Sequence, residues 1–155
     1  MKWDLSEKTE DAFVAYLKAT TSSDLRISAA WDRDEMQYPA VVIFAGSTAP
    51  VSEDAEWHDA RVLDVSVAVI TEAAPILDAT DGTVITTARE RNQNARSDVM
   101  DALFTTSLLT NLNTQAIEDV AFSQAQFSNT ERTVEGNNLI TAITGTVIAE
   151  PVTGS

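Results

Sequence analysis

The chain has 155 residues and a formal net charge of −14, and 44% of its residues are apolar. This length and composition are typical of one globular domain and exclude a largely disordered chain. The absence of cysteine excludes disulfides, thiolate nucleophiles and the usual zinc sites. A surface this acidic repels phosphate, which disfavours tight binding to nucleic acid.

Targeting signals are missing from the sequence. No apolar run approaches the roughly 20 residues that cross a bilayer, and the start, MKWDLSEKTEDAF, lacks the apolar core of a signal peptide. We therefore expect a protein that is made in a cytoplasm and makes no membrane contact. The acidic, lysine-poor composition is compatible with a salt-rich habitat and also with an ordinary acidic protein.

The first predicted element is a helix that ends at TTSSD (20–24). Its apolar residues fall at helical spacing on one side, which predicts a buried face formed by Ala12, Phe13, Tyr16 and Leu17. The other side is predicted to face solvent and carries Glu7, Lys8, Glu10, Asp11 and Lys18.

Three strands are predicted next, over 25–30, 38–46 and 61–71. The third reads RVLDVSVAVIT and alternates apolar with polar or small residues, which is typical of a strand with one buried face. A polar connection (31–37) separates the first two strands, and an acidic loop or hairpin tip (47–60) separates the second from the third.

A second helix is predicted to begin near Thr87, because Glu90 three residues later completes a capping box. It follows a connection (72–83) with turn chemistry at Asp81-Gly82. Leucines at 108, 109 and 112 extend its apolar pattern, and Asn111 and Asn113 mark the predicted stop. The predicted buried stripe consists of Ala88, Ala95, Val99, Ala102 and Leu103.

Two closing strands are predicted, at about 116–128 and 138–149, joined by a polar tip, SNTERTVEGNN (128–138). Small side chains at 142 and 144–146 suit close packing against a helix or another chain. Because consecutive strands with short links favour antiparallel pairing, the predicted class is α+β. We expect a mostly antiparallel sheet of about five strands, with two main helices on one face. Residues 1–150 would form a single domain, and 151–155 a flexible tail.

No catalytic residue, metal site or cofactor site is predicted. His58 is the only histidine, and its place in an acidic stretch favours an exposed loop side chain over a general base or metal ligand. The acids at 32, 34 and 35, and again at 53, 54, 56 and 59, favour solvated surface over a carboxylate pair or a weak divalent-ion site. The five glycines are too scattered for a phosphate-binding loop, and no Gly-x-Ser-x-Gly motif exists.

Three of the ten basic residues concentrate at Arg89, Arg91 and Arg96. Three interpretations remain open for this cluster. It could be a solvated helix surface with local partners such as Glu90 and Asp98, a patch that binds acids of a neighbouring copy, or a phosphate contact.

The segment YPAVVIFAGSTAPVSEDAEWHDARVLDVSVAVITEA (38–73) resembles the central part of the lambda-type tail terminator, or tail-completion, proteins of long-tailed bacteriophages. The likeness lies in the start Tyr38-Pro39-Ala40-Val41, the acidic loop that ends in Trp57, and the alternating strand that follows. The final strand Leu139–Ile148 and the order of elements also match. Residues 72–87 and the end of the second helix depart from the family pattern.

The resemblance implies a virion structural protein that forms a ring, a hexamer in this family, on the head-proximal end of the tail tube. Such a ring ends tube polymerisation and provides the surface that the head joins. The implied partners are other copies of the chain, the tail tube protein and a head-completion or neck protein. DNA would pass through an acidic lumen without specific binding. The protein would be assembled in the host cytoplasm and end in the tail or neck of the virion.

A subunit of this kind needs no active site, so the candidate functional residues are interface residues on the two polar loops and the arginine cluster. They are Glu53, Asp54, Glu56, Trp57, Asp59, Arg89, Arg91, Arg96, Glu131, Arg132 and Glu135. Two alternatives stay open, a neck or head–tail joining protein of related fold and a small acidic monomeric binding domain. An enzyme is the least favoured class.

Overall fold

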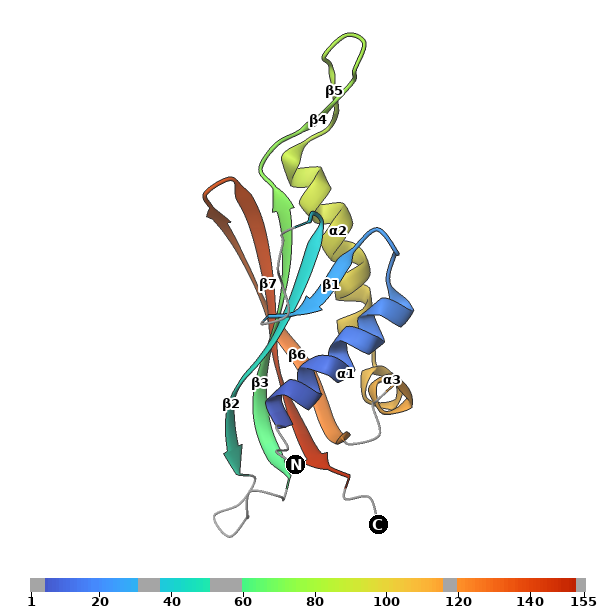
Figure 1. The fold of residues 1–155 in the computed structure, drawn as a ribbon, viewed down its shortest axis with the longest axis vertical. Coiled ribbons are helices and arrows are strands. Elements are labelled where there is room, and N and C mark those ends of the chain that lie inside the picture. Colours follow the sequence, from blue (N-terminus) through green and yellow to red (C-terminus); the bar gives the residue numbers. More distant parts are fainter. Residues whose placement is uncertain (1–4, 31–36, 51–59, 116–119, 153–155) are drawn as a thin grey trace.

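The computed structural model describes residues 5–30, 37–50, 60–115 and 120–152. Five strands form one sheet in the order β1-β2-β3-β7-β6, and the helices pack on one of its faces (Figure 1). The predicted α+β class is therefore confirmed. The elements are α1 (Leu5–Thr20), β1 (Arg26–Ala29), β2 (Ala40–Pro50), β3 (Arg61–Glu72), β4 (Ile76–Leu77), β5 (Val84–Thr86), α2 (Ala88–Leu103), α3 (Leu108–Gln115), β6 (Val120–Glu135) and β7 (Asn138–Pro151).

The sheet is built around β3, the strand that reads RVLDVSVAVIT. It pairs antiparallel with β7 along its whole length, from Arg61 opposite Ala149 to Glu72 opposite Asn138, without a register shift. Its apolar residues at 63, 65, 67 and 69 are buried beneath the helices, and Asp64 is exposed on the other face. The predicted period of two is confirmed.

One strand pair differs from the expected antiparallel arrangement. β1 runs parallel to β2, with Arg26 opposite Ala40 and Ala29 opposite Ile43. β1 has only four residues, or about 13 Å of strand, and ten residues (30–39) separate it from β2. A connection of ten residues is long enough for the chain to return to the end of the sheet at which β1 begins. β2 can therefore run parallel to β1 and need not form a hairpin with it.

The predicted polar tip at 128–138 is wrong. β6 and β7 continue as one long hairpin to a tight turn at Gly136 and Asn137, where Gly136 has a φ of 59°. The outer part of β6 is exposed, so no apolar alternation marks it as a strand. Backbone pairing with β7 holds it extended nevertheless. β7 also reaches Pro151, so the first residue of the predicted flexible tail belongs to a strand, and residues 153–155 lie outside the described ranges.

The predicted start of α2 is confirmed, and its predicted end is not. Thr87 is the N-cap and forms a capping box with Glu90. The leucines after Leu103 belong to a separate helix, α3, which passes through both predicted stop residues. One of these, Asn113, donates its amide to the carbonyl of Phe122 and accepts the N–H of Phe122, both at 2.9 Å. This pair of hydrogen bonds ties α3 to the first residues of β6.

Aromatic side chains join the helices to the sheet. The ring of Phe13 on α1 meets Phe122 and Phe127 of β6 edge to face, at centroid distances of 6.0 and 5.6 Å. The hydroxyl of the buried Tyr16 donates to the carbonyl of Ala102 on α2 at 2.6 Å. These contacts place α1 at the centre of the helical layer.

Glu10 was predicted on the solvent side of α1, but the structure buries it. Its carboxylate accepts the backbone N–H of Ala45 at 2.9 Å, beside a bulge in β2 between Ala45 and Thr48. A bulge disturbs the strand ladder, and a nearby carboxylate can accept a backbone N–H there. Helical periodicity cannot detect this requirement, because it comes from another element.

Gly145 is required by a close approach between β6 and β7. A Cβ atom at this position would clash with the carbonyl oxygen of Gln126 and lie 2.7 Å from the Cα of Phe127. β6 shifts register between Phe127 and Asn129 at this point. Both neighbouring atoms are backbone, so they cannot move aside as a flexible side chain would.

We therefore expect Gly145→Ala to lower the free energy of unfolding by about 1–3 kcal/mol, the usual cost of overpacking. Thr146→Ala, which changes the exposed next residue, is the control and should have little effect. Urea denaturation of both variants checks this. Equal stability of the Gly145 variant and the wild type would mean that the strands can separate at little cost.

Candidate interaction surfaces

The described residues were predicted to hold neither a metal site nor a catalytic residue, and the structure bears on the metal site alone. Among them, no three histidine or acidic side chains gather where they could hold a metal ion. His58 lies outside the described ranges, so its predicted role as a loop residue stays a prediction.

None of the described helices is long and apolar enough to cross a membrane.

The predicted acidic loop falls largely outside the described residues. Its five candidate interface residues, Glu53, Asp54, Glu56, Trp57 and Asp59, are all beyond them. What is described is its attachment to the sheet. β2 continues to Pro50, which lies opposite Arg61 at the start of β3, so residues 47–50 are strand and not loop.

Two predicted regions meet in a cleft between α2 and the outer part of the β6–β7 hairpin. Arg132 pairs with Thr141 of β7, and directly opposite residues in a strand pair share a face. Thr141 faces α2, because its hydroxyl donates to the side-chain oxygen of Asn92 at 2.7 Å. Arg132 therefore lies on the helix side of the sheet, next to the arginines of α2. We call this the arginine cleft; it has a volume of about 360 Å³ and is lined by Arg89, Asn92, Arg96, Arg132, Thr133, Val134, Leu139, Ile140 and Thr141.

The other candidates from these regions lie elsewhere. Glu131 and Glu135 pair with Ala142 and Asn138, so they lie on the sheet face opposite to Arg132. Arg91 does not line the cleft; its guanidinium donates to the carbonyl of Ala74 at 2.7 Å. The predicted group of three α2 arginines is therefore divided, and Arg132 joins two of them.

Asn92, which no sequence pattern singled out, fastens α2 to the sheet beneath the cleft. Its buried amide donates to the hydroxyl of Thr71 on β3 at 3.0 Å and to the carbonyl of Leu139 on β7 at 3.1 Å. Its oxygen accepts from Thr141 at 2.7 Å and from the guanidinium of Arg96 at 3.5 Å. One side chain thus sets the position of α2 on the two central strands and supports Arg96.

Asn92→Ala should lower the free energy of unfolding by about 2–3 kcal/mol, because it leaves buried hydroxyls without their partner. A double-mutant cycle with Thr141→Val should give a coupling energy of at least about 0.5 kcal/mol. The exposed neighbour Gln93, changed to alanine, is the control. Additive effects in denaturant unfolding would show that the hydrogen bond contributes nothing to stability.

The second surface is a small hairpin, β4–β5, which projects from one end of the molecule beyond the start of α2 (Figure 1). We call it the apolar arm. Its four large apolar side chains are exposed: Ile76 by 45%, Leu77 by 51%, Val84 by 55% and Ile85 by 62%. The hydrogen bond from Arg91 to Ala74 lies just before β4, so the base of the arm is attached to α2.

The turn of the arm is held by local hydrogen bonds. The carboxylate of Asp78 accepts the N–H of Thr80 at 2.7 Å, and Gly82 has a φ of 73°, which favours glycine. Backbone and hydroxyl hydrogen bonds from Thr83 lower the pKa of the Asp81 carboxyl. The stabilisation from Asp81 is therefore present above its ordinary pKa and is lost as the pH falls through the lowered value.

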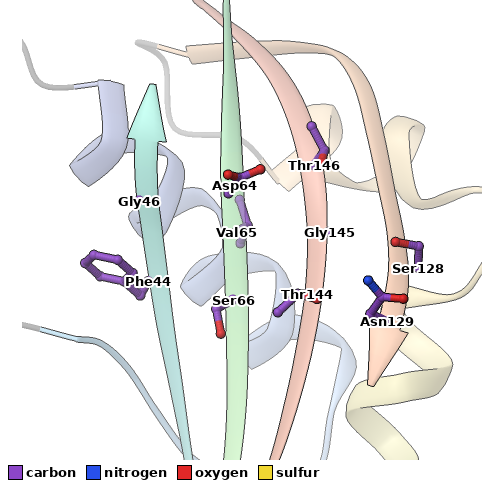
Figure 2. Close-up of a pocket in the computed structure, with 10 residues that line it drawn as sticks. All are labelled: Phe44, Gly46, Asp64, Val65, Ser66, Ser128, Asn129, Thr144, Gly145 and Thr146. Carbon is purple, nitrogen blue, oxygen red and sulfur yellow. The ribbon is translucent and has the colours of Figure 1, made fainter. Parts of the chain in front are cut away.

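The third surface is the open face of the sheet, opposite to the helices. Figure 2 shows a shallow hollow on it that is bounded by Phe44, Ser66, Asn129 and Thr146 from four neighbouring strands. By register, the acidic residues on this face of β3, β6 and β7 are Asp64, Glu72, Glu131, Glu135 and Glu150, and these three strands place no basic residue there. Arg26 of β1 lies opposite Ala40 and is on the same face, so among the described strands the open face carries five acids and one base, and the arginine cleft lies on the other side.

The arm was missed in the sequence, although a signal for it exists. Two short apolar runs, IL and VI, flank DATDGT, and an Asp-Gly pair between apolar runs is typical of a hairpin. The Asp-Gly pair predicts the turn, but the two apolar runs are too short to indicate strands by themselves. The burial of Asn92 and the position of Arg132 leave no trace in the local pattern.

Comparison with known proteins does not assign the chain to a family. It matches no protein-family model and no curated protein sequence.

Proposed function

We propose that this chain is a structural subunit that assembles with copies of itself, as a ring of the tail-terminator type. The apolar arm carries this proposal. Four large apolar side chains stand on a two-stranded hairpin, and a lone hairpin of this size is at best marginally stable in water. Contiguous exposed apolar surface of this kind marks a site of protein contact.

A second copy of the chain is the partner that best fits the arm. The arm is at one end of an elongated molecule (Figure 1), and no equivalent hairpin stands at the other end of the described structure. Contact between two different patches is head-to-tail, and such contacts close into rings when the rotation between copies allows it. The resemblance to tail terminators in residues 38–73 supports the same conclusion from an independent direction.

The charge of the open face agrees with a ring around DNA. The five acids on the open face would repel the DNA backbone if this face lined the lumen. DNA could then pass without binding. In this proposal the ring caps the tail tube at its head-proximal end, and its remaining surfaces meet the tube protein and a neck protein in the virion.

The first test is the assembly state of the purified chain. We expect closed rings, six-fold in the family that the sequence resembles, in negative-stain electron microscopy, and a matching mass by light scattering. Because a head-to-tail contact closes on itself, the mass should stop increasing at high concentration. A chain that stays monomeric at millimolar concentration, with and without tail tubes, would contradict the proposal.

The second test removes the apolar arm's side chains without shortening it. Leu77→Ser with Ile85→Ser should raise the concentration for half-assembly at least about tenfold, because each exposed side chain would lose roughly 1.5–3 kcal/mol of burial in the ring. Both side chains are exposed in the single chain, so its melting temperature should hardly change. Val152→Ser, at an exposed position near the other end of the chain, is the matched control. Unchanged assembly of the double variant would exclude the arm as the contact.

A further inference from the structure

The positive charge of the arginine cleft is not balanced by acidic residues in the cleft itself. In a chain with a net charge of −14, three of the ten basic residues, Arg89, Arg96 and Arg132, line one cleft. The acids on the same hairpin, Glu131 and Glu135, lie on the opposite face of the sheet. No acidic residue is among those that line the cleft, and Glu90, next to Arg89 on α2, is engaged in the capping box with Thr87. An anionic group from outside the chain would neutralise the cleft.

The residues that line the cleft favour a ligand with carboxylates next to an apolar or aromatic side chain. Arginine guanidinium groups bind carboxylates through paired N–H donors and also stack on aromatic rings. Beside the three arginines, the cleft is lined by Val134, which is 70% exposed, and by Leu139. A ligand that combines several carboxylates with one large aromatic ring would satisfy both kinds of lining residue.

The chain itself contains a segment of this composition. Residues 53–59 read EDAEWHD and hold four acids and one tryptophan in seven positions. The segment is attached to the sheet through Pro50 and Arg61, which lie at the opposite end of the sheet from the β6–β7 turn (Figure 1). The charges of segment 53–59 and of the arginine cleft are complementary. The distance between them determines whether the segment can bind the cleft of its own chain or that of another copy.

The segment's backbone is too short to reach the level of Arg132 in its own chain. Eight residues of β3 separate Arg61 from Val69, the residue level with Thr141 and Arg132, which is about 26 Å along the strand at about 3.3 Å per residue. Ten residues join Pro50 to Arg61, and five fully extended residues reach at most about 18 Å from either anchor. The backbone therefore stops about 8 Å short of the level of Thr141 and Arg132, by the difference of these two lengths.

We infer that the acidic segment 53–59 of one copy binds in the arginine cleft of the next copy. This inference rests on the proposed self-assembly and names the polar contact that accompanies the apolar arm. Because the anchors of the segment, Pro50 and Arg61, and the cleft lie at opposite ends of the sheet, the contact is head-to-tail. Each copy then uses its segment on one neighbour and its cleft on the other, which is the arrangement that a closed ring requires.

The test is a charge exchange between the two sides. The cleft variant carries Arg89→Glu, Arg96→Glu and Arg132→Glu; the segment variant carries Glu53→Lys, Asp54→Lys, Glu56→Lys and Asp59→Lys; a third protein carries all seven changes. Lys18→Glu with Arg26→Glu, two exposed positions outside the cleft, is the control for net charge. Circular dichroism and melting temperature establish that every variant folds.

We expect the cleft variant and the segment variant each to need at least about tenfold more protein for half-assembly, because each places like charges across the contact. The protein with all seven changes should reach half-assembly at a concentration within about threefold of the wild-type value. An equal mixture of the two one-sided variants should assemble again into rings in which the two variants alternate. The acidic segment of the cleft variant meets the arginine cleft of the segment variant, and the lysine-bearing segment of the segment variant meets the glutamate-bearing cleft of the cleft variant, so both kinds of contact are attractive. Wild-type assembly should weaken as NaCl is raised from 0.05 to about 0.5 M, since salt screens the charges.

Normal assembly of the cleft variant would overturn this inference and leave the proposed function standing. If the protein with all seven changes does not recover assembly, segment 53–59 is excluded as the occupant of the cleft. A short DNA duplex that binds the wild type and not the cleft variant, with assembly unchanged, would assign the cleft to phosphate and also overturn the inference. A wild-type chain that stays monomeric would contradict the proposed function itself. Failure of this inference and failure of the proposed function are therefore distinguishable.

Discussion

The unbroken pairing of β3 with β7 is the constraint on which the other features of this molecule depend. Twelve residues of β3, from Arg61 to Glu72, lie opposite twelve of β7 without a shift. A slip of one residue would exchange the two faces of the sheet. It would expose the valines beneath the helices and bury Asp64. The register also decides, through β7, that Arg132 lies on the helix side while Glu131 and Glu135 lie on the open side.

The helices are fastened to this sheet by polar contacts as well as by apolar packing. Asn92 bonds to β3 and β7 at once, and Glu10 accepts a backbone N–H from β2. Buried polar groups stabilise a fold only when they are hydrogen-bonded, so each restricts the helix to one position. α2 therefore holds Arg89 and Arg96 beside the β6–β7 hairpin and anchors the apolar arm through Arg91.

These features distribute chemically different surfaces over one elongated chain. One end carries exposed apolar side chains and an arginine cleft, and the open face of the sheet is acidic. A monomer gains nothing from such an arrangement, because its apolar surface stays in water. In the ring that we propose, each surface would have a place: the arm and the cleft at the contacts between copies, and the acids where DNA would pass.

The sequence by itself determined the α+β class, the strand at 61–71 and the capped start of α2 at Thr87, because alternation and capping are local properties of the chain. It could not determine the parallel β1, the burial of Glu10 and Asn92, or the extended course of 128–135, because each depends on a partner distant in sequence. Of the candidate site, the sequence identified the basic cluster on α2. Only the tertiary structure showed that Arg91 lies apart from this cluster and that Arg132 lies beside it. The reason is that the strand register determines which face of the sheet each side chain occupies, and two elements distant in sequence can share a cleft only when their side chains lie on the same face.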